Sequence, residues 1–357
     1  MKRYLLATLL LIFGAVGLRA QVWHDASEFP LYGKADPETP ALYQRLPAIE
    51  GLRPELVNLG KTSTGLYLRF RSDSPTLKIR WTSAGPRWMF NMVPVGTRGL
   101  DLYIHTAEGW KYAGSAKPAG PDKAASTSTV ISNMQPQMRE FMLYLSLYDG
   151  ITSLEIGVDE GSSLLSPQLG SPRDDSPMVF YGTSILQGAS ASRPGLAFTN
   201  RLARRFDRTA INLGFSGNAF LDPEIARLMA SVPDPCVYIL DYVPNAFADM
   251  IDERGEAFFR ILRDAHPDVP MIFVEDPIFP HSEFDSEIYK EISSKNVAQK
   301  RLYDKLRRQG EKHLYYISSD LLLQNEDTVD SIHPTDVGMD RYYRAYEKVL
   351  KKILRRK

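Results

Sequence analysis

Hydrophobic and polar residues alternate with a period of two through much of the first half of the chain. In LYLRFR (66–71), Leu66, Leu68 and Phe70 fall on one face of an extended segment. The same alternation recurs in TLKIRW (76–81), LDLYIHT (100–106), EFMLYLSLY (140–148) and SLEIGV (153–158), between turns rich in Gly, Pro and Ser. This pattern is typical of half-buried strands, and no amphipathic helix is indicated between about Lys61 and Val158. We therefore expect residues 21–165 to form an antiparallel, jelly-roll-like β-sandwich.

The second half has a different rhythm, in which short apolar runs alternate with helical patterns. The apolar runs are MVFYG (178–182), TAINLGF (209–215), CVYILDY (236–242), PMIFVED (270–276) and HLYYIS (313–318). Helices are expected to begin near Pro194, Asp222, Asp252 and Asp285, with a last one after Pro334. This alternation predicts a three-layer α/β/α domain over residues 178–357, with a parallel sheet covered on both faces. The preceding stretch is rich in Ser, Pro and Gly, so residues 166–177 are predicted to be a linker.

Composition and charge indicate how many domains to expect and which binding partners to exclude. The chain has 357 residues, which favours two domains, and 43% of them are hydrophobic while 24% are charged. Lys and Arg together number 43, as do Asp and Glu, so the net charge is zero. A neutral chain is not built around binding a polyanion, and no nucleic-acid partner is expected.

The N-terminus has the pattern of an export signal. Lys2 and Arg3 are followed by an almost wholly apolar run, residues 4–16, and Leu18-Arg19-Ala20 offers a cleavage site. The alternative, a membrane anchor, is weaker because the run is short for crossing a bilayer. We expect residues 1–20 to be a signal peptide, export to the periplasm or the exterior, and no membrane span after cleavage. The single cysteine, Cys236, opens an apolar segment and is expected to be buried and structural.

The first apolar run of the second half leads directly into a candidate nucleophile. MVFYGTSILQGAS (178–190) stops at a Gly-Thr-Ser turn, which places Ser184 just beyond the carboxyl end of the strand. Gly182 would permit a sharp exit, and Gly188 would keep the following loop tight. Taken alone, Ser184 is better explained as a local helix cap, which is a common role of serine. Ligands of parallel sheets gather at the carboxyl ends of the strands, so the other strand ends decide between the two interpretations.

The second and third strands end on groups that could donate hydrogen bonds to an oxyanion. NLGFSGNAF contains Gly214 and Gly217, where backbone N–H groups can face a ligand, although a plain glycine turn explains them equally well. In DYVPNAF, Pro244 breaks the strand and Asn245 follows. The Asn245 amide could stabilise a developing negative charge, or it could be a turn former.

The fifth strand is followed by DSIHPTDVG, in which Asp330 and His333 are three residues apart. Acyl transfer by serine needs an imidazole whose other ring nitrogen is held by a carboxylate, and this loop can supply both. His281 lies on the same side of the sheet and is a candidate substrate contact. The other four histidines lie outside this half, at a helix end or at the opposite edge: His24, His105, His266 and His313. A nucleophile, two donors and an acid–base pair at one edge predict a serine acyl hydrolase.

These residues resemble, in order, the four blocks of the SGNH (GDSL-like) hydrolase superfamily. YGTSILQGASASRPG, NLGFSGNA and DYVPN are similar to exported bacterial esterases of that superfamily, and GLDLYIHTAEGW resembles their β-sandwich N-terminal domain. The resemblance implies that Ser184 is the nucleophile, His333 the general base and Asp330 its orienting partner. It also implies an oxyanion hole made by the N–H groups of Ser184 and Gly217 and the side chain of Asn245.

The chain departs from the superfamily pattern at two places. Thr183 replaces the usual Asp of the GDS block, and Val243-Pro244 with Ala246 alters the GxND block. Neither change removes a catalytic group, but both argue against lipase-type substrates.

The substrate expected from the sequence is a small acyl ester, such as an acetyl ester, on a carbohydrate. Ser190, Ser192 and Arg193 suggest polar surroundings, and Arg193 is a candidate substrate-binding residue. No cofactor and no metal are expected. Two alternatives stay open: a glycan-binding protein without activity on the same scaffold, and a metal-dependent phosphoesterase. The metal site of the second would use Glu275, Asp276, His281, Asp330 and His333.

Overall fold

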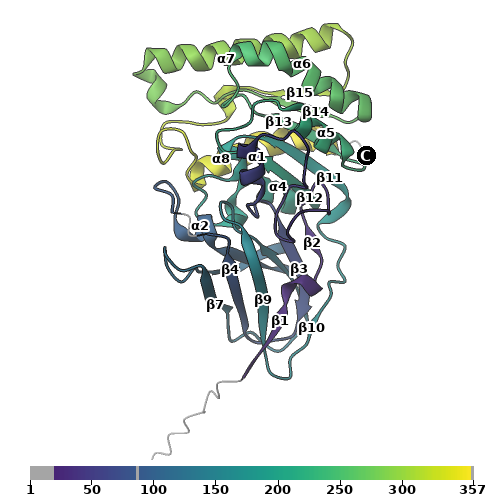
Figure 1. Cartoon of the computed structure of the whole chain (residues 1–357), viewed down its shortest axis with the longest axis vertical. Helices are drawn as coiled ribbons and strands as arrows, with labels where there is room; N and C mark the ends of the chain where they lie inside the picture. Colours follow the sequence, from purple (N-terminus) through teal and green to yellow (C-terminus); the bar gives the residue numbers. More distant parts are fainter. Residues whose placement is uncertain (1–19, 86–87, 355–357) are drawn as a thin grey trace, which may run out of the picture.

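A computed structural model describes residues 20–85 and 88–354. The chain folds into an antiparallel half and a parallel half, with both halves in contact along one side (Figure 1). All but the last residue of the proposed signal peptide lie outside the described residues. Among the helices that the structure describes, none combines the length and the apolar character needed to cross a membrane.

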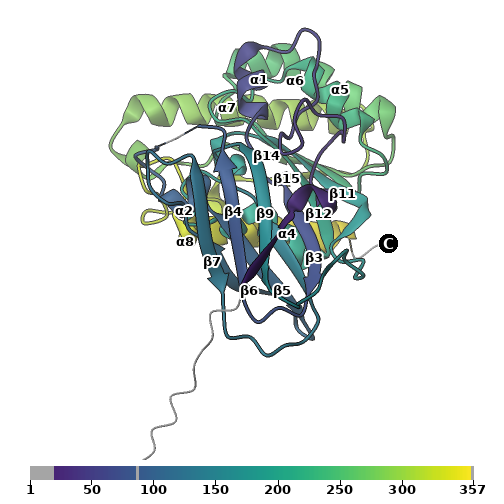
Figure 2. The same ribbon diagram turned by 60° about the horizontal axis from the view of Figure 1, so that its bottom comes forward.

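The antiparallel half is a sandwich of two sheets (Figure 2). One sheet has the order β1 (Gln21–Asp25), β9 (Ile151–Asp159), β4 (Leu77–Ser83) and β7 (Ala125–Ile131). The other has the order β10 (Leu164–Leu165), β3 (Tyr67–Ser72), β8 (Arg139–Tyr144), β5 (Leu100–Thr106) and β6 (Gly109–Ala116), with β2 (Leu31–Tyr32) beside β3. The residues that alternate toward the core, among them Leu68, Phe70, Ile79 and Trp81, meet between the sheets. The predicted β-sandwich is therefore confirmed.

One expectation for this half is wrong. Besides a short helix near its start, α1 (Pro54–Gly60), a second helix α2 (Pro94–Arg98) lies between β4 and β5. A helix of five residues makes little more than one turn, which is too short for an apolar period of 3.6 to show in the sequence. Pro94 stands in the first turn, where a proline costs no hydrogen bond.

The parallel half contains one five-stranded sheet. Its order is β12 (Arg208–Gly214), β11 (Arg173–Gly182), β13 (Val237–Asp241), β14 (Met271–Val274) and β15 (Leu314–Ile317), and every pairing is parallel. On one face pack α5 (Pro223–Ser231), α6 (Ala248–Ala265) and α7 (Ser286–Arg308). On the other face pack α4 (Phe198–Phe206) and α8 (Asp336–Leu354). This arrangement confirms the predicted three-layer fold.

The junction between the halves differs from the predicted linker. Strand β11 begins at Arg173, so the last five residues of the segment 166–177 are already extended and precede the buried part of the strand. These residues are mostly exposed, so the pattern of hydrophobic positions does not indicate that they belong to a strand.

A buried polar cluster ties the halves together. Asp101 on β5 is fully buried, and its carboxylate accepts hydrogen bonds from Arg193 (2.7 Å), the Gly195 N–H (2.8 Å) and the Ser115 hydroxyl (2.6 Å). Arg193 also donates to the Tyr103 hydroxyl at 2.8 Å. Because buried carboxylates are stable only when their acceptors are satisfied, this cluster fixes the relative position of the two halves.

Candidate active site

Ser184 is held at the carboxyl edge of the sheet by the turn that follows β11. It opens the short helix α3 (Ser184–Gln187), which Thr183 caps and Gly188 ends with φ of 101°. Gly182 is needed for packing rather than for a sharp exit. A Cβ at Gly182 would lie 2.5 Å from the carbonyl oxygen of Asp241 on the neighbouring strand. The absence of a side chain therefore allows β11 and β13 to run side by side up to the nucleophile.

The structure brings Ser184, His333 and Asp330 together. The Ser184 Oγ lies 2.9 Å from the His333 Nε2, and the His333 Nδ1 lies 2.7 Å from the Asp330 Oδ2. The other carboxylate oxygen, Asp330 Oδ1, accepts from the backbone N–H of His333 at 2.8 Å. Asp330 is thereby clamped in the orientation in which an Nδ1–H donates to it and the Nε2 is left to accept from Ser184.

The surroundings keep Asp330 in its charged form. Partial burial acts to raise the pKa of Asp330, but hydrogen bonds from the backbone and ring of His333 and from Asn91 outweigh it, so the pKa is lowered. A carboxylate that stays ionised at neutral pH can stabilise an imidazolium beside it.

Gly217 and Asn245, the two other oxyanion-hole candidates, line the cavity that Ser184 and His333 also line. Gly217 has φ of 67°, and no heavy atom lies within 4 Å of the Cβ that a side chain would add there. The side-chain oxygen of Asn245 accepts from the Ala219 N–H at 3.3 Å, so the NH₂ end of the amide is the end left for a ligand. Both residues line the same cavity as Ser184 and His333.

This cavity has a volume of about 420 Å³. Its walls are formed by Thr183, Ser184, Ile185, Ser216, Gly217, Pro244, Asn245, Phe279, His281, Ile288, Glu291, Ile292, Lys295, Ile332 and His333. The Lys295 ammonium lies 2.7 Å from Glu291 and 3.6 Å from Asp276, so its charge is already paired within the protein. Burial raises the pKa of Asp276 to about 7 although Lys295 lowers it.

The two candidate substrate contacts have different positions. His281 lines the cavity, and its Nδ1 is buried with no partner among the described residues. Arg193 does not reach the cavity, because its guanidinium is engaged by Asp101 and by the ring of Tyr112 at 3.8 Å. Ser192 binds Asp336 and Ser190 donates to the Asn91 carbonyl, so these serines do not line it either. The polar surroundings expected from residues 190–193 are thus absent from the cavity wall, which has a large apolar part.

Several supporting residues gave no signal in the sequence. The Asn91 amide lies 2.9 Å from Asp330 Oδ2, and Asn91 belongs to the N-terminal half. The Tyr148 hydroxyl donates to the Ser184 carbonyl at 3.2 Å, and the Gln187 side chain bridges Leu147 and the Ser216 N–H. Each of these contacts spans a turn or a domain junction that local patterning does not specify.

The residues of the alternative metal site do not converge. Glu275 accepts from the Tyr316 hydroxyl at 2.7 Å and the Ser319 N–H at 2.8 Å, and Asp276 is fully buried beside Lys295. In the part of the chain that the structure describes, no group of three His, Cys, Asp or Glu residues is placed to hold a metal ion.

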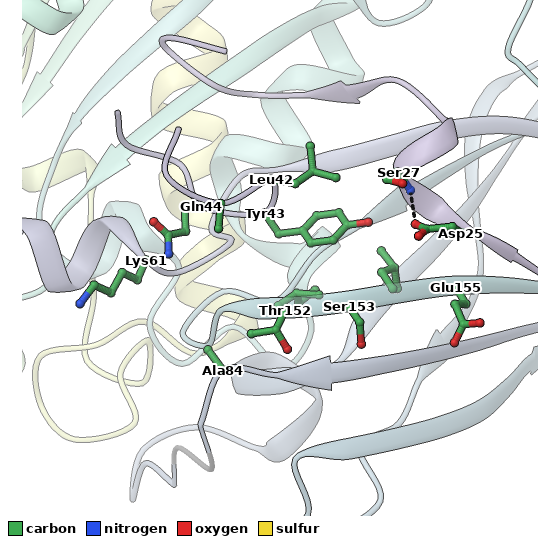
Figure 3. Close-up of a pocket in the computed structure, with 13 residues that line it drawn as sticks. Asp25, Ser27, Leu42, Tyr43, Gln44, Lys61, Ala84, Thr152, Ser153 and Glu155 are labelled. Atoms are coloured by element: carbon green, nitrogen blue, oxygen red, sulfur yellow. Dashed lines mark hydrogen bonds between the residues drawn. The ribbon is translucent and has the colours of Figure 1, made fainter. Parts of the chain in front are cut away.

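A second cavity, of about 440 Å³, lies on the N-terminal half (Figure 3). Tyr43 is the only aromatic residue among those that line it, and Asp25, Lys61 and Glu155 bring charge to its walls. It contains none of the triad or oxyanion candidates.

Comparisons with known proteins agree with this geometry. A family model described as GDSL-like lipase/acylhydrolase matches residues 175–351, and a model for the N-terminus of SGNH-hydrolase-type esterases, GxDLY, matches residues 21–164. The second name corresponds here to Gly99–Tyr103, which includes the buried Asp101. No curated protein matches the chain.

Among solved structures, a protein of Bacteroides ovatus described as a GDSL-like lipase has 34% sequence identity and a TM-score of 0.89, covering 94% of this chain and 98% of its own. A salicylyl-acyltransferase from a tetracycline biosynthetic pathway (17% identity, TM-score 0.69, 92% and 96% covered) shares the fold. So does a family two carbohydrate esterase from Cellvibrio japonicus (14%, 0.58, 94% and 99%). With both halves matched, the chain belongs to the GDSL-like lipase/acylhydrolase (SGNH) family and is a hydrolase that acts on esters.

Proposed function

We propose that this protein is an exported serine esterase that removes small acyl groups, acetyl above all, from carbohydrate through a Ser184–His333–Asp330 triad. The observation that carries the proposal is the chain of two hydrogen bonds, 2.9 Å and 2.7 Å long, that joins the Ser184 Oγ to the Asp330 carboxylate through the His333 ring. Export is supported by the charged and apolar pattern of the first 20 residues.

In the proposed reaction, the Ser184 Oγ attacks the ester carbonyl carbon while its proton passes to the His333 Nε2. The carbonyl oxygen becomes an oxyanion, which accepts hydrogen bonds from the N–H groups of Ser184 and Gly217 and from the Asn245 amide. Collapse of this intermediate breaks the bond to the alcohol, which leaves with the proton from His333. The acyl group stays on Ser184.

Hydrolysis of the acyl-enzyme repeats the same steps with water as the nucleophile. His333 takes a proton from the water, whose oxygen attacks the acyl carbon, and the proton is then delivered to the Ser184 Oγ as the acid leaves. Asp330 stabilises the imidazolium in both halves of the cycle and exchanges no proton itself.

The form of the cavity supports a sugar ester. Phe279, Ile288 and Ile332 offer apolar contact, while His281 and Glu291 offer hydrogen bonds, and a sugar ring has apolar faces with hydroxyl groups at its edge. Structural neighbours that are described as carbohydrate esterases, at low sequence identity to this chain, also support a sugar ester as the substrate. A cavity of about 420 Å³ has room for the sugar as well as for the acetyl group.

The test compares wild type with Ser184→Ala on p-nitrophenyl acetate and on acetylated oligosaccharides, with release of acetate as the second readout. We expect the variant to lose about 10³-fold or more in kcat, as nucleophiles of such triads do, and chelator to leave the wild-type rate unchanged. Ser192→Ala is the matched control, because Ser192 pairs with Asp336 outside the cavity and should keep full activity.

Activity that persists in Ser184→Ala contradicts the proposed nucleophile. Loss of wild-type activity with chelator supports the metal-dependent alternative. Binding of acetylated oligosaccharides without release of acetate supports the glycan-binding alternative. A clear preference for long-chain p-nitrophenyl esters contradicts the acetyl specificity while leaving the triad in place.

A further inference from the structure

A side chain of the N-terminal half reaches the triad of the other half. Asn91 lies in the segment between β4 and α2, and its side chain is almost fully buried. The Nδ2 atom lies 2.9 Å from Asp330 Oδ2 and 3.1 Å from His333 Nδ1. It is therefore placed at the point where the carboxylate and the imidazole of the triad meet.

The chemistry of this contact fixes which end of the amide faces the triad. Asp330 Oδ2 is an acceptor and already receives the His333 Nδ1–H. If the amide were turned round, its carbonyl oxygen would face a carboxylate oxygen, and two acceptors would repel each other. The NH₂ group is thus the end that points to Asp330, and it donates a charge-assisted hydrogen bond. The Asn91 Oδ1 is buried with no partner among the described residues.

The segment that carries Asn91 is held by the other half of the molecule on both sides. The Asn91 carbonyl accepts a hydrogen bond from the Ser190 hydroxyl at 2.8 Å, and Ser190 lies just after the helix that Ser184 opens. Met92 packs into the core under α4 and α8. Farther on, a Cβ at Gly96 would lie 2.3 Å from the Ala191 carbonyl oxygen, so only glycine allows this close approach. The amide therefore meets Asp330 in a preorganised geometry.

We propose that Asn91 is a positioning residue of the catalytic triad, through which the β-sandwich half completes the active site. Its NH₂ group holds Asp330 Oδ2 in line with the His333 Nδ1 and shares the negative charge of the carboxylate. This inference rests on the proposed role of Ser184, His333 and Asp330. It gives the N-terminal half a part in catalysis that does not depend on contact with substrate.

The predicted consequence is a change in how the pair Asp330 and His333 titrates. A donor that shares the carboxylate charge weakens its attraction for an imidazolium. Without the donor, the imidazolium is favoured, so the pKa that governs the acid side of the rate profile should rise. Within the N-terminal half, Tyr148 interacts electrostatically with Asp330, and burial keeps Tyr148 protonated by raising its pKa. The charged or titratable groups across the cavity are His281, Glu291 and Lys295.

The experiment measures kcat, KM and the pH profile of kcat/KM for Asn91→Ala and Asn91→Asp on p-nitrophenyl acetate. For Asn91→Ala we expect about a tenfold lower kcat, the cost of one hydrogen bond to a charged group. KM should change less than about twofold, because no substrate contact is lost, and the acid limb should move to higher pH by about half a unit. Asn91→Asp keeps the shape but replaces the donor by a second carboxylate, so we expect about a hundredfold loss and a larger shift.

Phe90→Ala is the control on the same segment, since Phe90 is 77% exposed and does not line the cavity. It should match wild type in kcat and in pH profile. Thermal unfolding of every variant is measured alongside, so that kcat refers to folded protein only.

The proposal is overturned if both Asn91 variants keep the wild-type kcat and acid limb. It is also overturned if Asn91→Asp matches wild type while Asn91→Ala alone loses activity, because the amide would then act through its volume. These outcomes are separate from failure of the proposed function, which would appear as activity remaining in Ser184→Ala.

Discussion

Two buried polar clusters join the halves of this molecule, and they are built in opposite ways. Around Asp101, three donors from three different segments satisfy both carboxylate oxygens, the carboxylate is fully buried, and Asp101 is not among the residues that line the active-site cavity. Around Asp330, the carboxylate is about one-sixth exposed, and the chain of hydrogen bonds continues through His333 to Ser184 at the wall of an open cavity.

The difference shows what makes a buried carboxylate structural or functional. The hydrogen-bond network around Asp101 stays within the protein, because every group around the carboxylate is hydrogen-bonded to another protein group. Asp101 therefore contributes stability and fixes the relative position of the two halves. Asp330 begins a network that ends on a hydroxyl facing a space where a substrate fits. The two clusters are connected through the segment 91–101, which carries Asn91 to the triad and Asp101 to Arg193. The following predictions compare the clusters, beginning with the largest effect.

Asp330→Asn should have the largest effect on activity. An amide at this position can present its NH₂ to the ring and favour the wrong tautomer of His333, so we expect kcat to fall by about 10³–10⁴-fold. The unfolding midpoint should change little. Steady-state kinetics with thermal unfolding tests this, and Asp336→Asn, which changes an exposed contact to Ser192, is the control. A variant with near wild-type kcat would show that Asp330 is no more catalytic than Asp101.

Asn245→Ala should have the next largest effect. Loss of one oxyanion donor lowers kcat by about 10²–10³-fold, while KM should stay close to the wild-type value. The contact of its side-chain oxygen with the Ala219 N–H is long, at 3.3 Å, so the cost in stability should be small. Unchanged kcat would remove Asn245 from the oxyanion hole.

Asp101→Asn should separate stability from activity. The amide can accept at only one of the two positions where the carboxylate accepts, and it leaves the Arg193 guanidinium without its charged partner. Breaking such a buried pair costs about 3–5 kcal/mol of unfolding free energy. The kcat of the molecules that remain folded should stay within about twofold of wild type, because no triad group is touched. Urea unfolding and activity of the same sample measure both. Asp175→Asn, which breaks an exposed contact to Arg173, should leave the unfolding midpoint unchanged. A stable Asp101→Asn protein with low kcat would reverse the comparison.

Asp241 lies between the two cases, and its predicted effect is on the pH dependence of stability rather than on activity. One of its oxygens accepts from the Tyr346 hydroxyl at 2.6 Å and the other has no partner among the described residues. Burial raises the pKa of Asp241 to about 8. Between the usual pKa of 3.8 and the raised pKa of about 8, the folded state therefore keeps a proton on Asp241 that the unfolded state has released. Stability from this group is complete at acid pH and is lost as pH rises from about 4 to about 8, at up to about 1.4 kcal/mol per pH unit.

The measurement is the unfolding free energy of wild type and Asp241→Asn between pH 5 and pH 8, and the variant should show the flatter curve. Asp276, whose pKa is raised to about 7, leaves a residual slope in both proteins. Identical slopes in the two proteins would mean that Asp241 is charged in the folded state.

Much of the fold and of the candidate site could be predicted from local pattern. Period-two alternation marked the sandwich, and alternation of strands with helices marked the parallel sheet, because each pattern follows from which face a segment buries. Ser184, His333, Gly217 and Asn245 could be placed together since the carboxyl ends of parallel strands meet at one edge. The least accurate predictions were boundaries, such as the start of β11 at Arg173, where exposed residues carry no hydrophobic signal.

The sequence by itself determined the layers and the sheet edge at which the candidate catalytic residues gather. Only the tertiary structure decided that Arg193 belongs to the Asp101 cluster rather than to the cavity, and that Asn91 meets Asp330 from a segment 239 positions away. The physical reason is that local patterns and long-range contacts depend on different parts of the chain. Periodicity reports which side of a segment faces a core, but a hydrogen bond between side chains far apart in the sequence depends on how the two halves of the molecule pack together.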